Sequence, residues 1–272
     1  MGKVRIMGIL NITPDSFSDG GQLGNRDEIV RRIEEMVEAG VDIFDVGGES
    51  TRPFADPVPE QEELDRVLPV IERIRQVSEK PISIDTTKAA VAAAALAAGA
   101  EIVNDISALQ QDPGMLEVVK EVPGQVIIMH MQGTPGNMQV NPQYDDVVAD
   151  IFHFFEERIE LLTARGIDKA RIIIDPGIGF GKTVEHNLKI LRNIGEFKKL
   201  ECPVLIGHSR KSFLGSTLGL DITRRDCATA ILSFYCIRQG ADILRVHDAE
   251  LTRQAVRLQQ LLEAGEDDQP SC

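Results

Sequence analysis

The sequence predicts a single α/β domain folded as a (β/α)8 barrel, the TIM barrel. Short apolar runs alternate with longer amphipathic segments along the whole chain. The runs are apolar throughout, which indicates strands that are buried on both faces and pair in parallel. The strand–helix unit recurs eight times without a break in composition, as a closed barrel requires. A doubly wound open sheet is the alternative, but eight units are more than it usually needs.

The elements follow one another in regular order. The predicted strands are residues 4–10, 41–46, 82–84, 102–103, 126–129, 172–174, 204–206 and 243–246. The predicted helices are residues 27–39, 60–77, 88–98, 113–121, 145–165, 184–199, 223–238 and 249–262. Several helices end at a glycine, which accepts the left-handed conformation common there: Gly40, Gly99, Gly166 and Gly240. The barrel domain therefore spans residues 1–262, and residues 263–272 form a polar tail that we expect to be disordered.

Composition limits the partners of this chain of 272 residues. It carries 43 acidic and 29 basic side chains, a net charge of −14, which argues against binding to nucleic acid or anionic membranes. No apolar run approaches the ~20 residues of a membrane span, and the N-terminal segment lacks the features of a signal peptide. The cysteines lack metal-site spacing: Cys202, Cys227, Cys236 and Cys272. We expect a cytoplasmic protein with reduced thiols.

Polar residues follow every predicted strand. In a (β/α)8 barrel the C-terminal ends of the strands, and the loops after them, form the active site. These positions hold Asn11, Asp45, Asp85, Asn104, Asp105, His130, Asp175, the segment 207–211, Arg245 and His247. Asp45 and Asp105 are explained equally well as helix caps or turn formers. Eight polar strand ends at one rim nevertheless predict a functional site.

Basic side chains gather in or beside the same loops: Arg52, Lys182, Arg210, Lys211, Arg245 and His247. Each alone is more easily a solvated surface cation. The segment 209–212 (SRKS) directly follows a buried strand, and this is a stronger indication that something negative or polar docks there. A rim of cations in an acidic protein suits an anionic substrate, such as a phosphate ester or a carboxylate.

The glycine-rich segment 175–183 is not a P-loop. A Walker A motif requires a glycine five residues before the Gly181–Lys182 pair, and Pro176 stands there. We interpret the segment as a loop that lies close to a flat ligand, with Phe180 available to pack on it. Residues 16–21 and 47–59 are two further long loops, which we predict to be mobile.

Several segments resemble those of dihydropteroate synthases. The two longest are residues 7–21 (MGILNITPDSFSDGG) and 45–53 (DVGGESTRP). Shorter matches follow in the family's order at residues 84–86, 103–106, 129–135, 175–182, 209–212 and 245–248. The resemblance runs through all eight units. It implies a folate-pathway enzyme and sulfonamide target that joins (7,8-dihydropterin-6-yl)methyl diphosphate to 4-aminobenzoate and releases pyrophosphate.

The resemblance also implies a role for individual residues. The pterin pocket would be lined by Asp85, Asn104, Asp175 and Lys211. The diphosphate would be held by Asn11, Arg245 and His247, with Asn11 also binding Mg²⁺. The implied catalytic residues are Asp85, Lys211, Arg245 and His247. The 4-aminobenzoate pocket and its mobile loops would comprise Phe17, Asp19, Thr51, Arg52, Pro53, Phe180 and Ser212. We expect His130 to be structural.

The sequence leaves two alternative functions to weigh, and it predicts an oligomeric state. A methyltetrahydrofolate:corrinoid methyltransferase also binds a pterin in such a barrel, but it holds no diphosphate, so Arg245 and His247 argue against it. A non-catalytic pterin-binding barrel would not need the intact set of polar strand ends. The helix at 223–238 is apolar around most of its circumference, whereas a barrel helix needs one buried stripe. We therefore predict a homodimer, which the resemblance also implies.

Overall fold

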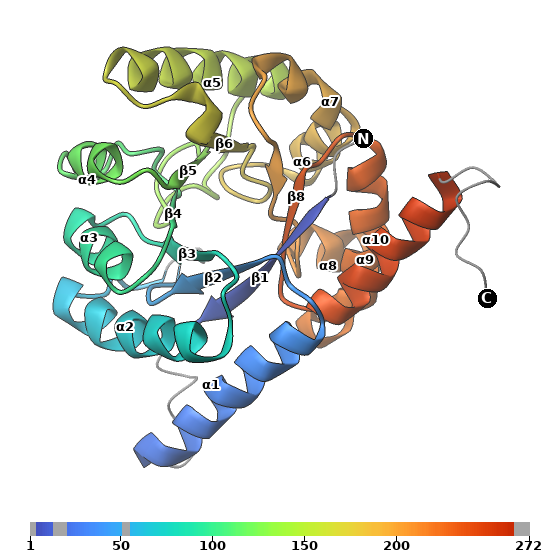
Figure 1. Cartoon of the computed structure of the whole chain (residues 1–272). Coiled ribbons are helices and arrows are strands. Elements are labelled where there is room, and N and C mark those ends of the chain that lie inside the picture. The colour runs from blue at the N-terminus through green and yellow to red at the C-terminus, as the bar shows by residue number, and fades with distance from the viewer. Residues whose placement is uncertain (1–3, 13–20, 51–54, 264–272) are drawn as a thin grey trace.

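The computed structural model describes residues 4–12, 21–50 and 55–263. Parallel strands lie at the centre of the molecule and helices surround them (Figure 1). The strands are β1 (Arg5–Asn11), β2 (Ile43–Gly47), β3 (Ile82–Asp85), β4 (Ile102–Asp105), β5 (Gln125–Met129), β6 (Ile172–Asp175), β7 (Leu205–Ile206) and β8 (Ile243–Val246). Each strand overlaps one predicted apolar run, so the predicted barrel is confirmed.

The helices match the prediction with three differences, of which the first is that the helix predicted at 27–39 begins at Gly21. They are α1 (Gly21–Glu38), α2 (Glu60–Val77), α3 (Ala89–Ala97), α4 (Met115–Glu121), α5 (Val147–Ala164), α6 (Val184–Arg192), α7 (Ile194–Phe197), α8 (Ser212–Leu218), α9 (Arg225–Arg238) and α10 (Ala249–Glu263). Short 3-10 turns are η2 (Lys169–Arg171), η3 (Lys198–Leu200) and η4 (Ile222–Arg224). The predicted helix at 184–199 is divided at Asn193, and α8 was not predicted. No helix in the described ranges has the length and apolar character of a membrane span.

The strands pair in the order β6-β5-β4-β3-β2-β1-β8-β7, with every ladder parallel. The ends of this sheet meet between β6 and the residues just before β7. A parallel bridge joins Ile174 to Val204, and the Ile174 N–H donates to the Pro203 carbonyl over 3.0 Å. The sheet is therefore a nearly closed barrel, and the C-terminal ends of all its strands surround one mouth.

Alternate residues of each strand face opposite sides, and the buried apolar residues divide accordingly. Residues that face the helices belong to one large core cluster; on β2 they are Phe44 and Val46, and on β3 they are Ile82 and Ile84. A second cluster fills the barrel interior near the N-terminal ends of the strands: Met7, Ile43, Ile102, Ile127, Ile173, Leu205 and Ile243. Every strand except β3 contributes to this inner layer. It makes a packed apolar floor beneath the mouth.

Candidate active site

Polar side chains replace the apolar ones two residues further along the strands. The inward positions that follow the apolar floor on β2, β4, β6 and β8 hold Asp45, Asn104, Asp175 and Arg245. On β3 the inward position at the strand end is Asp85. The four acidic or amide residues are each more than nine-tenths buried. The same strand geometry that builds the floor therefore brings charged groups together inside the mouth.

Arg245 is the centre of this group. Its Nε donates to Asp45 Oδ2 over 2.6 Å, and its Nη2 lies 2.5 Å from Oδ2 of both Asp45 and Asp85. Asp45 also accepts a long hydrogen bond, 3.4 Å, from Asn104 Nδ2. Residues from β2, β3, β4 and β8 are thus joined in one buried network. Sequence reasoning left the role of Asp45 open, and the structure places it inside the candidate site.

The two carboxylates share a single guanidinium, and this sets the charge of Asp85. Burial raises the pKa of Asp85 to about 7, because the ionised form loses its hydration; Arg245 opposes the shift and the neighbouring Asp45 adds to it. Burial also disfavours the charged form of Arg245, but Asp45 and Asp85 more than compensate, so its pKa is raised. Near neutral pH, Asp85 therefore exchanges between its two charge states while Arg245 stays positive.

Asp105 has the other role that the sequence left open. Its carboxylate accepts from the backbone N–H of Ser107 over 2.7 Å and from that of Leu109 over 3.2 Å. It belongs to the face of β4 that points away from the barrel interior. Asp105 therefore stabilises the turn after β4 and takes no part in the network around Arg245.

Asp175 and Lys211 complete the buried wall opposite β2 and β3. Asp175 Oδ1 accepts from the Gly177 N–H over 2.8 Å, and burial raises the pKa of this carboxyl. A methyl group on Gly207 would lie 3.5 Å from Asp175 Oδ2 and 4.0 Å from Arg245 Cδ. Gly207, at the exit of β7, therefore lies directly beside both side chains.

Lys211 stands over the glycine-rich loop. Its Nζ lies 3.9 Å from the centroid of the Phe180 ring, a cation–π contact. Burial and the nearby Arg245 lower the pKa of Lys211 to about 8, although Asp175 and Asp85 oppose the shift. Phe180 itself is buried against Met129 and Met138. The aromatic ring and the ammonium group therefore lie together at the mouth, and packing of Phe180 on a flat ligand stays a prediction.

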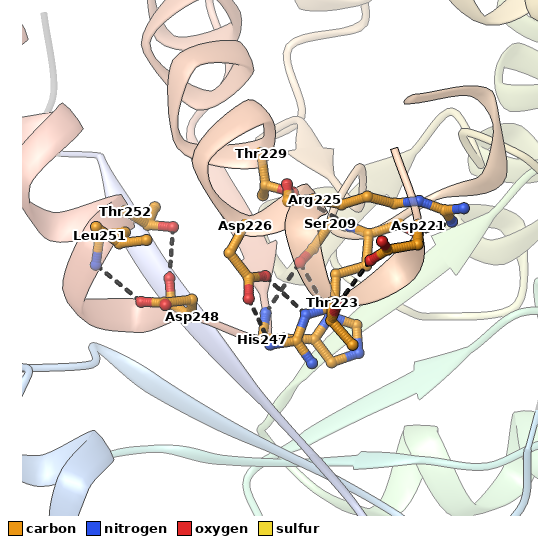
Figure 2. A network of polar contacts seen from close by, with 11 residues as sticks. Ser209, Asp221, Thr223, Arg225, Asp226, Thr229, His247, Asp248, Leu251 and Thr252 are labelled. Carbon is orange, nitrogen blue, oxygen red and sulfur yellow. Dashed lines mark hydrogen bonds and ion pairs between the residues drawn. The ribbon is translucent and has the colours of Figure 1, made fainter. Parts of the chain in front are cut away.

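His247 is held by Ser209 (Figure 2). The His247 backbone N–H donates to Ser209 Oγ over 3.1 Å, and Ser209 Oγ lies 2.9 Å from His247 Nδ1. Burial and the positive charges of Arg210 and Arg245 lower the pKa of His247 to about 3. The imidazole is therefore neutral at pH 7. When Nδ1 accepts from the serine hydroxyl, Nε2 carries the proton and is a hydrogen-bond donor.

Three of the basic residues predicted at the rim are not free surface cations. His247 is neutral for the reason just given. Arg210 is paired with Asp226 through two hydrogen bonds of 2.7 Å. Lys182 is buried by the loop, with only 3% of its surface exposed, and its Nζ is bonded to His130 Nδ1 and to the carbonyls of His130 and Phe180 at 2.9–3.2 Å. Among the predicted rim cations that the structure describes, Lys211 and Arg245 are the two that lie beside Asp85 and Asp175 at the mouth.

His130 has the structural environment that we expected. Burial and the nearby Lys182 lower its pKa to about 3, so the ring is neutral and can accept from Lys182. Its ring meets the edge of Phe154 with centroids 5.0 Å apart. His130 and Lys182 together connect the end of β5 to the glycine-rich loop, behind Phe180.

Asn11 lies at the end of β1 with an exposed side chain. A methyl group on Gly47 would lie 3.4 Å from both Asn11 Oδ1 and Asp85 Cβ, so the amide and the carboxyl flank the same glycine. No group of three or more His, Cys, Asp or Glu residues in the described ranges is arranged to hold a metal ion.

The remaining predicted residues belong to the loops. Ser212 is the first residue of α8 and is exposed. The other five lie outside the described residues: Phe17, Asp19, Thr51, Arg52 and Pro53. The strand-end residues are therefore brought together as predicted, and the contributions of the two long loops stay predictions.

His208 lies behind the site and predicts an acid sensitivity of the fold. It is fully buried, bonded to Ser233 Oγ at 2.9 Å, and burial lowers its pKa from 6.5 to about 4. The unfolded chain binds this proton more tightly, so the stabilising contribution is complete above pH 6.5 and is lost as the pH falls toward 4. The slope reaches about 1.4 kcal/mol per pH unit.

Urea unfolding between pH 6.5 and 4 measures this contribution. The free energy of unfolding should depend less steeply on pH in His208→Gln than in the wild type. The matched variant His153→Gln, at an exposed position of α5, should leave the slope unchanged. Equal slopes in all three proteins would contradict the assignment.

The chain is similar to known proteins over nearly its whole length. The family model described as "Pterin binding enzyme" matches residues 7–247. The chain is 46% identical to the dihydropteroate synthase of Haemophilus influenzae, over 94% of this chain and 93% of the relative. A Yersinia pestis dihydropteroate synthase solved with a sulfonamide drug complex superposes with a TM-score of 0.91 at 44% identity, covering 97% of this chain and 95% of the other.

A dihydropteroate synthase from Xanthomonas albilineans, solved in complex with 7,8-dihydropteroate, gives a TM-score of 0.88 at 40% identity, with coverage of 97% and 95%. These relatives extend over nearly the whole chain, and the family match begins at β1 and ends at His247. The match therefore contains every strand whose end forms the buried network. The chain belongs to the dihydropteroate synthase family, a family of pterin-binding transferases.

Proposed function

We propose that this protein condenses (7,8-dihydropterin-6-yl)methyl diphosphate with 4-aminobenzoate, giving 7,8-dihydropteroate and pyrophosphate. The observation that carries the proposal is the buried group at the barrel mouth, in which Arg245 joins Asp45 and Asp85 beside Asn104. The neighbour from Xanthomonas albilineans, solved with 7,8-dihydropteroate, supports the identity of the product.

The pterin would lie between the glycine-rich loop and the network around Arg245. A carboxylate such as Asp175 can accept two parallel hydrogen bonds from a 2-amino-pyrimidinone edge, as it does from a guanidinium. Asn104 offers both a donor and an acceptor, and the Lys211 ammonium can donate to a ring nitrogen or carbonyl. The buried position of these groups makes each hydrogen bond selective, because an unmatched ligand would leave them unpaired.

Arg245, His247 and Asn11 would hold the diphosphate. Arg245 supplies positive charge, and neutral His247 supplies the N–H of its Nε2. The Asn11 amide oxygen would hold Mg²⁺, an ion that takes most of its oxygen ligands from phosphate and water. When bound, the ion would neutralise part of the negative charge of the diphosphate.

The reaction would proceed by departure of pyrophosphate before the amine attacks. The C–O bond to the pterin methylene breaks with both electrons going to pyrophosphate, and the ring stabilises the resulting cation. Ionised Asp85 would stabilise this positive charge while Arg245 stabilises the leaving group. The amine nitrogen of 4-aminobenzoate then forms the C–N bond and loses one proton to solvent. An arylamine is neutral, so it requires no strong base.

The 4-aminobenzoate would bind against Phe180 and Ser212, with the two long loops closing over it. Phe17, Thr51, Arg52 and Pro53 would form the other wall, and Asp19 would pair with Arg52 to exclude water. Sulfonamide binding by this protein is supported by the Yersinia pestis relative, which was solved with a sulfonamide drug complex. A cytoplasmic location, inferred from the composition, stays a prediction.

An assay of pyrophosphate release tests the function. Pyrophosphate should appear only when both substrates are present, in equal amount to 7,8-dihydropteroate. A correctly folded protein that releases none would contradict the proposal. Methyl transfer from methyltetrahydrofolate to a corrinoid would support the alternative enzyme class instead.

We further propose that a second copy of the chain covers the outer face of α9. The buried residues of α9 are mostly small or polar: Thr229, Ser233, Cys236 and Ile237. Its outward stripe, at intervals of four residues, holds the exposed Cys227, Ile231 and Tyr235. Ile231 is 68% exposed, which is unfavourable for an apolar side chain in water. An ordinary surface helix has apolar residues on its buried side and polar residues on its exposed side. In α9 this distribution is reversed, which fits a dimer interface.

Light scattering tests the dimer. The wild type should have twice the mass of one chain, and Ile231→Glu should convert it to a monomer because a charge would be buried in the interface. Val140→Glu, at a site that is 71% exposed, should remain a dimer. A monomeric wild type, or a dimeric Ile231→Glu, would show that this face is not the interface.

A further inference from the structure

Arg210 has an unusual backbone conformation at a central position of the site. It lies between Ser209, which is bonded to His247, and Lys211, which stands over Phe180. Its φ is +56°, in the left-handed region. A side chain other than glycine pays roughly 1–2 kcal/mol for this conformation, so surrounding contacts must hold the residue there.

Residues at the start of α9 supply those contacts. Asp226 accepts from Arg210 Nε and Nη2, each over 2.7 Å. Thr229 Oγ1 accepts from the Arg210 N–H over 3.2 Å, while its own hydroxyl donates to the Arg225 carbonyl over 2.9 Å. Arg225 Nη1 donates to the Arg210 carbonyl over 3.0 Å. The N–H, the carbonyl and the guanidinium of Arg210 are therefore all bonded to α9.

Figure 2 shows Arg225, Asp226 and Thr229 in one network of polar contacts with Ser209 and His247. The bidentate pair occupies the Nε and Nη2 side of the planar guanidinium, so this side of Arg210 is directed at Asp226. Asp226 also has a partly buried side chain, 20% exposed, so the pair is screened less than one on the open surface.

We infer that Arg210 is a positioning residue: α9 holds it in the left-handed conformation, and this directs Ser209 to His247 and Lys211 to the pterin pocket. The assignment rests on the proposed function of the site. It departs from the simplest interpretation of the SRKS segment, in which both basic side chains bind the substrate. Lys211 binds the ligand, and Arg210 sets the backbone that presents Lys211 and Ser209.

Two substitutions at the same position separate positioning from direct binding. Arg210→Ala removes the guanidinium and keeps the cost of the left-handed backbone. Arg210→Gly removes the same guanidinium but adopts that backbone freely. If Arg210 acts through the backbone, kcat/KM for the pterin diphosphate should be about tenfold higher in Arg210→Gly than in Arg210→Ala, equivalent to ~1.4 kcal/mol. If Arg210 binds the substrate, the two variants should be equally impaired, and the inference is wrong.

Asp226→Asn tests the other side of the contact. It should lower kcat/KM in the wild-type background and have little further effect in Arg210→Gly, because its partner is gone. Arg224→Ala, an exposed cation in the neighbouring 3-10 turn, is the control and should be active. An Asp226→Asn enzyme with wild-type kinetics, or equal losses in both backgrounds, would overturn the inference.

A spectroscopic measurement distinguishes failure of this inference from failure of the proposed function. The ¹⁵N chemical shifts of His247 report which ring nitrogen carries the proton, with no substrate present. The Nε2–H form should predominate in the wild type and in Arg210→Gly, and should be mixed with the Nδ1–H form in Arg210→Ala. A His247 spectrum identical in all three proteins would contradict positioning, whether or not pyrophosphate is released.

Discussion

Replacing Asp85 with asparagine is expected to lower kcat/KM for the pterin diphosphate by about 1,000-fold. Asp85 is only 7% exposed at the end of β3, where its negative charge would face the cation that develops on the pterin methylene. Asparagine keeps the shape and removes the charge, so most of the loss should appear in kcat. Steady-state kinetics with saturating 4-aminobenzoate measures the effect.

The Asp85→Asn protein should still fold, because Arg245 keeps its bonds to Asp45. Its thermal unfolding therefore needs to be measured beside the kinetics. Asp65→Asn makes the same chemical change on an exposed part of α2 and should leave kcat/KM within twofold of the wild type. If the activity of Asp85→Asn is within tenfold of the wild type, the Asp85 carboxylate has no direct role in the chemistry.

The second large effect is expected at Lys211. Lys211→Met should lower kcat/KM by about 100-fold, since a charged hydrogen bond to the pterin is lost and the buried Asp175 loses a nearby positive charge. Methionine is one atom shorter than lysine, but it keeps an unbranched apolar stem and removes the ammonium group over Phe180. The loss should therefore come from the missing charge, and it should be visible in pterin binding as well as in turnover.

The pH dependence of kcat/KM tests Asp85 and Lys211 in the wild-type protein. With Asp85 needed as the anion and Lys211 as the cation, kcat/KM should rise as the pH passes about 7 and fall as it passes about 8. In Lys211→Arg the fall above pH 8 should disappear, because arginine stays protonated. A wild-type profile that is flat between pH 6 and 9 would contradict both assignments.

Much of this site could be predicted from the sequence because strand geometry is regular. A buried parallel strand reads as an apolar run, and a polar residue at its end must lie at the barrel mouth. This rule is sufficient to locate Asp85, Asn104, Asp175 and Arg245 at the mouth from the amino-acid sequence alone. The floor of apolar residues on alternate strand positions follows from the same regularity.

Other features depend on contacts that no local pattern encodes. Asp45 lies shortly before Gly47 and Gly48, so in the sequence it looks like a turn former such as Asp105. Its ion pair is with Arg245, which is 200 positions away along the chain. The charge state of His247 depends on burial and on neighbouring cations. The short helix α8, with an internal glycine, has weak intrinsic helix propensity, and the burial of Phe213 and Leu214 stabilises it.

A crystal structure with the pterin diphosphate bound tests the central claim most directly. We expect the pyrimidinone edge on Asp175, the methylene carbon facing Asp85, and the diphosphate in contact with Arg245 and His247. A pterin bound elsewhere on the molecule, with Arg245 still paired to Asp45 and Asp85 and touching no ligand, would contradict it.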